Sequence, residues 1–208
     1  MNPQSIVVRQ ADGWPGRLNL PCHGAPMNAT PAHRFRLLVC VFALSGAIAS
    51  ADSLPVQSVP HVDLKRYTGT WYEIAAFPMF FQRQCIGDAT AEYQARPDGD
   101  IAVVNRCRTE TGFDEAVGKA WAVNGAGNGQ LKVSFFWPFR SDYWVIGLDD
   151  AYQWAAVGNP NRKYLWVLSR SPQLPSDQLD RALEAAASQG FDLTQLVYTR
   201  HGRTSAMP

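Results

Sequence analysis

Tyr67-Thr-Gly-Thr-Trp-Tyr-Glu-Ile-Ala-Ala-Phe77 predicts a turn that leads into a β-strand. Gly69 can take backbone conformations that are closed to residues with a Cβ atom. Trp71, two positions later, carries a large aromatic side chain that needs a pocket. From Trp71 onward, successive residues fall alternately on two faces, which is the period of a strand. An indole at the start of a first strand suits a plug for one end of a barrel, so we expect a partner for it further along the chain.

Seven more segments with strand-like character follow this first one at near-regular spacing, joined by short turns rich in Gly, Pro and Asn. They are residues 89–95, 101–107, 118–124, 130–137, 142–149, 153–158 and 164–170. Such spacing predicts an up-and-down antiparallel sheet, and eight strands are enough to close it. The expected fold class is therefore all-β, an eight-stranded antiparallel up-and-down β-barrel.

One convincing helix follows the last of these strands. Ser176 is the expected N-cap, Asp177 lies in the first turn, and Gly190 ends the helix. Its apolar residues recur at helical spacing and form a single stripe, so we expect the helix to pack against the outside of the barrel. Residues 196–199 are expected to form a short final strand.

The N-terminal region predicts an export signal. Residues 1–26 show little periodicity and are interpreted as an extension, and residues 27–51 combine a positive start, an apolar run and small residues at a cleavage site. The apolar run is shorter than the roughly 20 residues of a membrane span. Residues 52–61 are then a linker, 62–202 the folded domain and 203–208 a tail.

Cys40 raises the alternative of a lipid anchor. A lipidated cysteine follows a small residue at the end of the apolar run, whereas Val39 precedes Cys40 and the run continues beyond it. We therefore expect a protein that is soluble in the periplasm after cleavage, with association with the outer membrane as the alternative.

Two cysteines remain once residues 1–51 are removed. Cys85 and Cys107 are 22 residues apart and flank a predicted hairpin that turns at residues 96–99. In an oxidising compartment such a pair favours a structural disulfide. The alternative is a reactive thiol pair, but neither cysteine has the Cys-x-x-Cys spacing or an adjacent histidine that would lower a thiol pKa.

Composition and charge exclude several classes of function. The chain is 46% hydrophobic and 12% aromatic, so it can build a core, and its net charge of +1 without a long basic run argues against nucleic acid as a partner. No catalytic triad or metal-ligand spacing is visible, and His61 and His201 lie outside the predicted strands. We expect no metal, no cofactor and no enzymatic activity.

Arg170, at the end of the last barrel strand, is a candidate partner for Trp71. Its guanidinium could lie across the indole face, an interaction that contributes about 0.5 to 2 kcal/mol. On the residues alone, an ordinary exposed arginine is an equally good interpretation.

Three short motifs together resemble those of the lipocalins. They are Gly69-Thr-Trp71 at the first strand, Asp149 in the turn that follows Leu148, and Arg170 after the last strand. The stretch from residue 62 to about 202 is similar in particular to the bacterial lipocalins related to apolipoprotein D. That resemblance implies a calyx closed at the end of Trp71 and Arg170 and open at the other end. It also implies non-enzymatic binding, storage or transport of a fatty acid, lysophospholipid or similar lipid in the cell envelope.

Alternation along the strands predicts which residues face the interior of the barrel. The predicted ligand-binding residues are Tyr93, Val103, Asn105, Val133, Phe135, Trp137, Tyr164 and Trp166. The resemblance to apolipoprotein D implies the same for Tyr93, Asn105 and Trp166. Side chains could instead fill a small barrel completely, but several alanines on the inward faces favour a cavity.

Two other classes of function stay open. One is an envelope enzyme or redox protein that uses Cys85 and Cys107. The other is a structural or interaction protein, in which Trp121 on the outer face marks a homodimer surface or lies under the helix. Peripheral contact with the outer membrane is a further expected interaction.

Overall fold

The computed structural model describes residues 54–123 and 127–202. The predicted extension 1–26, the export signal 27–51 with Cys40, the start of the linker and the tail 203–208 lie outside the described residues.

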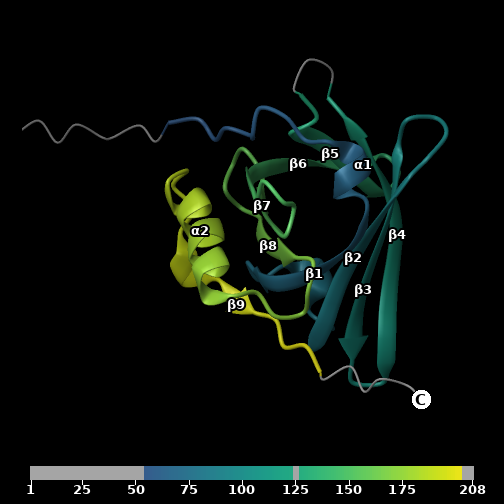
Figure 1. The fold of residues 1–208 in the computed structure, drawn as a ribbon. Helices are drawn as coiled ribbons and strands as arrows, with labels where there is room; N and C mark the ends of the chain where they lie inside the picture. Colours follow the sequence, from purple (N-terminus) through teal and green to yellow (C-terminus); the bar gives the residue numbers. More distant parts are fainter. Residues whose placement is uncertain (1–53, 124–126, 203–208) are drawn as a thin grey trace, which may run out of the picture. The chain divides into compact units, whose positions relative to one another are not determined.

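The described residues form an antiparallel β-sheet that closes on itself (Figure 1). Its strands are β1 Gly69–Ala76, β2 Gly87–Ala95, β3 Ile101–Thr109, β4 Gly112–Ala122, β5 Gln130–Phe136, β6 Phe139–Leu148, β7 Trp154–Gly158, β8 Leu165–Ser169 and β9 Val197–Tyr198. The order is β2-β3-β4-β5-β6-β7-β8-β1-β9, and a further pairing of β1 with β2 closes the first eight strands into a barrel. The predicted eight-stranded up-and-down barrel, with a short additional strand, is confirmed.

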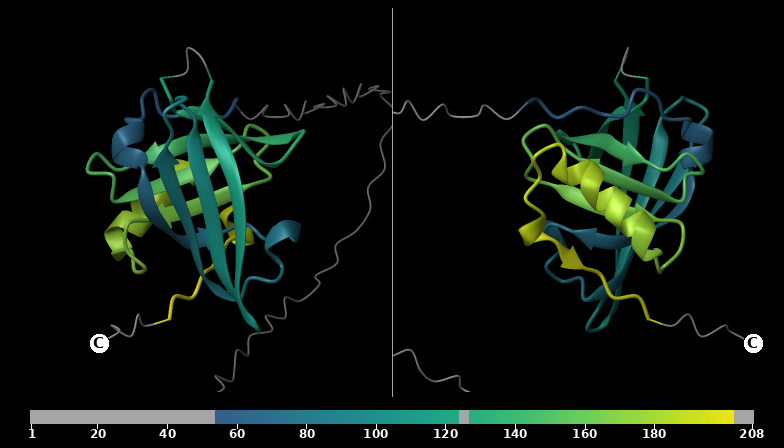
Figure 2. Two further views of the ribbon diagram at one scale, coloured as in Figure 1. Left: turned by 90° about the vertical axis from the view of Figure 1, so that its right-hand side faces the viewer. Right: turned by 60° about the vertical axis from the view of Figure 1, so that its left-hand side comes forward.

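Two strands begin three or more residues earlier than predicted. β4 starts at Gly112 rather than residue 118, and β6 starts at Phe139 rather than residue 142. Phe113 and Val117, in the first half of β4, are 56% and 63% exposed. A strand segment that is exposed on both faces shows no alternation, so the sequence pattern missed it. Strands β2, β3 and β4 run side by side through the length of the barrel (Figure 2, left).

A helix covers one side of the barrel, as predicted (Figure 2, right). α2 Ser176–Ala187 packs on β6, β7 and β8. A Cβ on Gly147 of β6 would meet the Cβ of Ala185 at 2.7 Å, so this glycine allows the close approach. Trp121 lies on β4, which α2 does not contact, so of the two alternatives for this residue the position under the helix is ruled out.

The caps of α2 differ partly from the prediction. Pro175, not Ser176, is the N-cap residue, and no side-chain hydrogen bond caps this end. At the other end Gly190 has φ of +79°. The amide of Phe191 donates to the carbonyl of Ala186 at 3.2 Å, and that of Gly190 donates to Ala187 at 2.9 Å. This pattern is a Schellman C-cap, which requires a left-handed residue at the glycine.

Shorter helical segments complete the fold. They are α1 Leu64–Tyr67, η1 Phe80–Gln82 and η2 Leu193–Gln195. Within residues 54–123 and 127–202, no helix has the length and apolar character that a membrane crossing requires.

The buried side chains form one cluster inside the barrel and two further clusters between the barrel and α2. The largest residues of the inner core include Trp71, Tyr67 and Leu131, which are at most 1% exposed. Ile146, Ala186 and Phe191 belong to the layer between sheet and helix. The strands under α2 are therefore buried on both faces, whereas β2 to β5 have one face exposed to solvent.

Candidate ligand-binding cavity

Trp71 and Arg170 close one end of the barrel. Trp71 is fully buried, and the guanidinium carbon of Arg170 lies 3.9 Å from the centre of its ring system. The guanidinium also donates to the carbonyl oxygens of Thr70 at 3.0 Å and Arg66 at 2.6 Å. The indole Nε1–H donates to the carbonyl of Tyr67 at 2.8 Å. The pair therefore ties β1, β8 and the short helix α1 together at this end.

Gly69 and Asp149 shape the backbone around that pair. Gly69 has φ of +94°, and a Cβ there would lie 3.3 Å from Nη1 of Arg170, so glycine suits this position for two reasons. The Oδ2 atom of Asp149 accepts from the amides of Ala151 at 3.0 Å and Gln153 at 3.1 Å and holds the β6–β7 turn. The three motif positions thus lie at the same end of the barrel.

The turn held by Asp149 also fastens α1. The hydroxyl of Tyr152 accepts from the amide of Asp63, the N-cap of α1, at 2.8 Å. The guanidinium of Arg66 lies 4.0 Å from the centre of the Tyr152 ring and donates to the carbonyl of Asp150 at 2.8 Å. These contacts seal the end of the barrel that Trp71 plugs.

A cavity of about 500 Å³ occupies the barrel interior beyond this plug. Seven of the eight predicted ligand-binding residues line it, namely Tyr93, Val103, Asn105, Val133, Phe135, Tyr164 and Trp166. Alanines 89, 91, 116 and 120 line it as well, and their small side chains leave the space open. The volume lies within the usual range of about 300 to 1,000 Å³ for small-molecule sites.

Trp137 is the exception and corrects the prediction. It lies in the turn between β5 and β6, is 79% exposed, and is not part of the cavity wall. Strand β5 ends at Phe136, so the alternation that holds through Phe135 does not extend to the turn.

A chain of three tyrosine hydroxyls lies at the inner end of the cavity. The Tyr143 hydroxyl lies 2.8 Å from that of Tyr67 and 2.9 Å from that of Tyr93. Burial raises the pKa of Tyr93 to about 12 and also raises the pKa values of Tyr67 and Tyr143, so the three stay protonated. Two hydrogen bonds use two of the three protons. One proton is therefore left for another acceptor, and both Tyr93 and Tyr143 line the cavity.

Asn105 supplies a second polar group in the wall. Its Oδ1 atom is buried and has no hydrogen-bond donor among the described residues. A buried acceptor without a donor is unfavourable by about 1 to 3 kcal/mol. A hydroxyl or amide group of a bound molecule would satisfy it.

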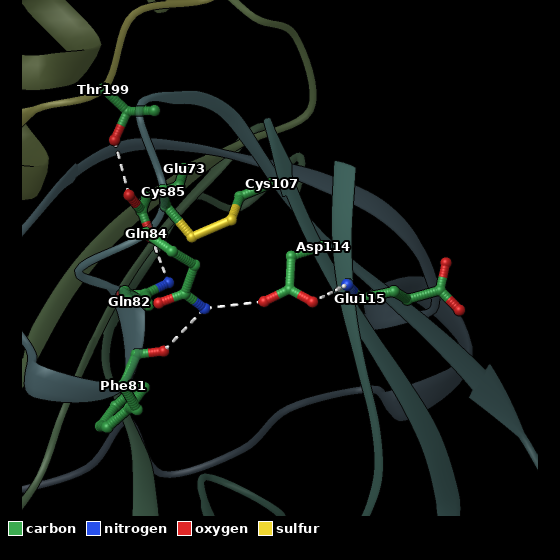
Figure 3. The surroundings of a disulfide bond; sticks show 9 residues. All are labelled: Glu73, Phe81, Gln82, Gln84, Cys85, Cys107, Asp114, Glu115 and Thr199. Carbon is green, nitrogen blue, oxygen red and sulfur yellow. Dashed lines mark hydrogen bonds between the residues drawn. A yellow bond between two sulfur atoms is a disulfide. The ribbon is translucent and has the colours of Figure 1, made fainter. Parts of the chain in front are cut away.

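The open end of the barrel is bordered by η1 and the β5–β6 hairpin. Phe80 and Phe81 from the first and Phe136 and Phe139 from the second contribute to the cavity wall there. A disulfide joins Cys85, after η1, to Cys107 on β3, with the Cα atoms 5.5 Å apart (Figure 3). The predicted disulfide is therefore confirmed. Closing a 22-residue loop stabilises the fold by about 3 kcal/mol in the chain-entropy model.

Further hydrogen bonds hold η1 in place (Figure 3). The side-chain amide of Gln84 donates to Asp114 on β4 at 2.8 Å. Glu73 on β1 accepts from Gln82 of η1 at 3.3 Å and from the hydroxyl of Thr199, after β9, at 2.5 Å. Desolvation raises the pKa of Glu73, against the opposing effect of these two hydrogen bonds.

Glu73 and Tyr143 were not among the predicted site residues. The alternation of β1 places Glu73 on the same face as the plug Trp71, and a carboxylate on an inward face was the available signal. Tyr143 gave no comparable signal, because its partners are 76 and 50 residues away in the sequence.

Among the described residues, no group of three His, Cys, Asp or Glu side chains is arranged to hold a metal ion. The imidazole of His201 contacts the backbone carbonyl of Glu73 at 2.8 Å and lies 4.0 Å from Asp88, outside the cavity wall. The cysteines that the redox alternative requires are bonded to each other.

A closed antiparallel barrel, plugged at one end and holding a largely apolar cavity, defines a class of small-molecule binding proteins. The chain belongs to the lipocalin family, because the family model of the Lipocalin-like domain matches residues 62–201. The resemblance to bacterial lipocalins related to apolipoprotein D is confirmed by relatives of both kinds.

Outer membrane lipoprotein Blc of Vibrio cholerae is 41% identical over 167 residues, which cover 79% of this chain and 96% of that protein. The protein of the same name in Escherichia coli K12 is 38% identical over 173 residues, covering 79% and 97%. Apolipoprotein D of Macaca fascicularis is 31% identical over 182 residues, covering 78% and 94%. Among solved structures, insecticyanin of the tobacco hornworm Manduca sexta superposes with a TM-score of 0.59 at 21% identity, covering 71% of this chain and 85% of that one, which supports the fold.

Proposed function

We propose that this lipocalin binds a small hydrophobic ligand, such as a fatty acid or a lysophospholipid, in its barrel cavity and carries or stores it without chemical change. The observation that carries the proposal is the cavity of about 500 Å³ with an aromatic and aliphatic wall inside a barrel closed at one end. Val103, Val133 and Trp166 supply apolar surface for an acyl chain.

The polar groups around the cavity suggest how such a ligand is oriented. Arg140 borders the cavity on β6 near the open end and suits a carboxylate or phosphate head group. Two acids nearby are already engaged, because Asp142 pairs with Lys132 at 2.5 Å and Asp114 accepts from Gln84. Asn105 and Tyr93, deeper in the barrel, can bond a hydroxyl or carbonyl group of the bound molecule.

The same proposal places the protein in the cell envelope. Residues 62–202 form the binding domain, and residues 27–51 would direct export and be removed. The relatives from Vibrio cholerae and Escherichia coli are named as outer membrane lipoproteins. An oxidising compartment also agrees with the disulfide between Cys85 and Cys107. We propose a soluble periplasmic form, in line with the poor lipidation context of Cys40.

The test combines an unbiased search for a retained ligand with a titration. Native mass spectrometry of protein purified from the envelope of its host should show an added mass that fits a lipid. Titration with a fatty acid should change the fluorescence of Trp166 in a saturable way. The change should disappear in Trp166→Phe and persist in Trp121→Phe, since Trp121 lies outside the cavity wall. No retained mass and no saturable change in the wild type would refute the proposal.

A further inference from the structure

The β5–β6 hairpin ends in a cluster of exposed aromatic side chains, which we call the aromatic tip. It consists of Phe136, Trp137 and Phe139, which are 72%, 79% and 70% exposed. The rings of Phe136 and Phe139 are nearly parallel with centres 6.2 Å apart. The hairpin projects from the side of the barrel (Figure 2, left). Such exposure is unfavourable in water, so the tip marks an interaction site.

The size of the aromatic tip argues against an ordinary protein partner. At about 200 Å² for an aromatic side chain, the three residues expose roughly 450 Å² of apolar surface. One side of a standard protein–protein interface buries about 800 Å². A projecting hairpin is also a poor match for a flat surface of a second copy, whereas it can enter a deformable phase.

The neighbours of the aromatic tip have the composition of a membrane-interface site. Phe80 of η1 is 69% exposed and borders the same cavity as Phe136 and Phe139. Arg140 directly follows the tip and Arg83 directly follows η1, and both are exposed with no ion pair among the described residues. Aromatic rings flanked by arginines favour the boundary between lipid head groups and acyl chains.

We propose that the aromatic tip and η1 dock on the surface of a phospholipid bilayer, with Trp137 inserted among the lipids and Arg140 and Arg83 near the phosphates. The open end of the cavity then faces the bilayer, because Phe80, Phe136 and Phe139 belong to both surfaces. An acyl chain passes between membrane and barrel without crossing water. This last step rests on the proposed function, whereas the docking itself does not.

The test uses the full exported chain and vesicles of phosphatidylethanolamine and phosphatidylglycerol. The wild type should sediment with the vesicles, and Trp137→Glu should lower the partition coefficient about tenfold or more, since it removes an interfacial aromatic and adds a charge that the lipid phosphates repel. Tyr198→Glu is the matched control. Tyr198 on β9 is 55% exposed and lies outside the cavity wall, so this variant should bind vesicles like the wild type.

Two further measurements make the test specific. Lipids brominated in their acyl chains should quench the emission of Trp137, and this quenching should be lost in Trp137→Phe although that variant still sediments. Fatty-acid affinity in vesicle-free buffer should be unchanged in Trp137→Glu, because Trp137 does not line the cavity. If the wild type itself showed no fatty-acid affinity in vesicle-free buffer, that result would instead count against the proposed function.

The proposal is overturned by any of three results. Trp137→Glu could sediment with vesicles as well as the wild type does. Brominated lipids could quench the wild type and Trp137→Phe equally. Sedimentation velocity could show a dimer that Trp137→Glu dissociates while neither protein binds vesicles, which would make a second copy the occupant of the aromatic tip.

Discussion

Among single residues, Arg170 combines two kinds of contact at the closed end. It stacks on Trp71 and bonds two carbonyl oxygens, at 3.0 Å and 2.6 Å. Lysine keeps the charge but lacks the planar fork that makes these contacts together. We expect Arg170→Lys to lower the free energy of unfolding by about 2 kcal/mol in urea titrations, since hydrogen bonds from charged groups contribute about 1.5 to 3 kcal/mol.

Arg181→Lys provides the control for that variant. Arg181 is exposed and pairs with Asp177 one turn away on α2, so the change should cost less than about 0.5 kcal/mol. Equal stabilities of Arg170→Lys and the control would show that the guanidinium contacts do not stabilise the plug.

Single residues also show where sequence reasoning succeeds and where it stops. Gly69, Trp71 and Arg170 could be singled out because each has a backbone, size or charge requirement that few environments satisfy. The hydroxyl chain of Tyr67, Tyr143 and Tyr93 could not, since its members come from α1, β6 and β2. Alternation predicts which face a side chain takes, but not which distant side chain it meets at the same height in the barrel.

Among the elements, Glu73 joins η1 to the C-terminal segment, and this junction should respond to pH. The raised pKa of Glu73 means that the folded protein binds the carboxyl proton more tightly than the unfolded chain does. At low pH, where the carboxyl is protonated in both states, the raised pKa of Glu73 therefore has no effect on the free energy of unfolding. As pH rises from the ordinary pKa of 4.5 through the raised pKa, it lowers the free energy of unfolding.

Glu73→Gln removes that titration while its carbonyl can still accept from Thr199. The stability of Glu73→Gln relative to the wild type should rise with pH above about 4.5 and level off above the folded-state pKa. Urea unfolding at a series of pH values measures this difference. Glu92→Gln, at an exposed position on β2, controls for the loss of one negative charge. A relative stability of Glu73→Gln that is flat with pH would contradict the prediction.

The hairpins show why some element boundaries were missed. The first half of β4 pairs with β3 but is exposed on both faces, so its sequence has no hydrophobic period to detect. In β5 the opposite error occurred, because the aromatic run through Phe135 and Phe136 extended the apparent alternation into the turn at Trp137. Both errors lie near the open end, where residues border solvent and the mouth instead of a packed interior.

For the whole molecule, the number and order of the strands could be predicted because short turns leave an antiparallel meander as the simplest topology. The pairing of β1 with β2 and β8 that closes the barrel then followed from the strand count. The balance between a filled and a hollow interior depends on how side chains of different strands share the space. Small residues on β2 and β4, such as Ala91 and Ala120, decide it in favour of a cavity.

The wall of a closed barrel cannot spread to admit a larger side chain, whereas an open sheet could. Ala91 on β2 faces the cavity between Trp71 on β1 and Asn105 on β3. In Ala91→Phe the added ring should occupy space that an acyl chain would otherwise fill. Displacing two methylene groups costs about 1.6 kcal/mol at about 0.8 kcal/mol each, which weakens binding more than tenfold. Calorimetric titration with a fatty acid measures this loss.

Ala102→Phe adds the same ring to the outer face of the barrel. Ala102 pairs with Gln94 and Lys119 and lies outside the cavity wall. Fatty-acid affinity of this variant should therefore match the wild type. Thermal unfolding of both variants checks that each barrel is intact, because filling a cavity adds buried apolar contacts and should not destabilise Ala91→Phe by more than about 1 to 3 kcal/mol. If folded Ala91→Phe bound fatty acid as tightly as Ala102→Phe, the ligand would have to occupy a surface outside the barrel.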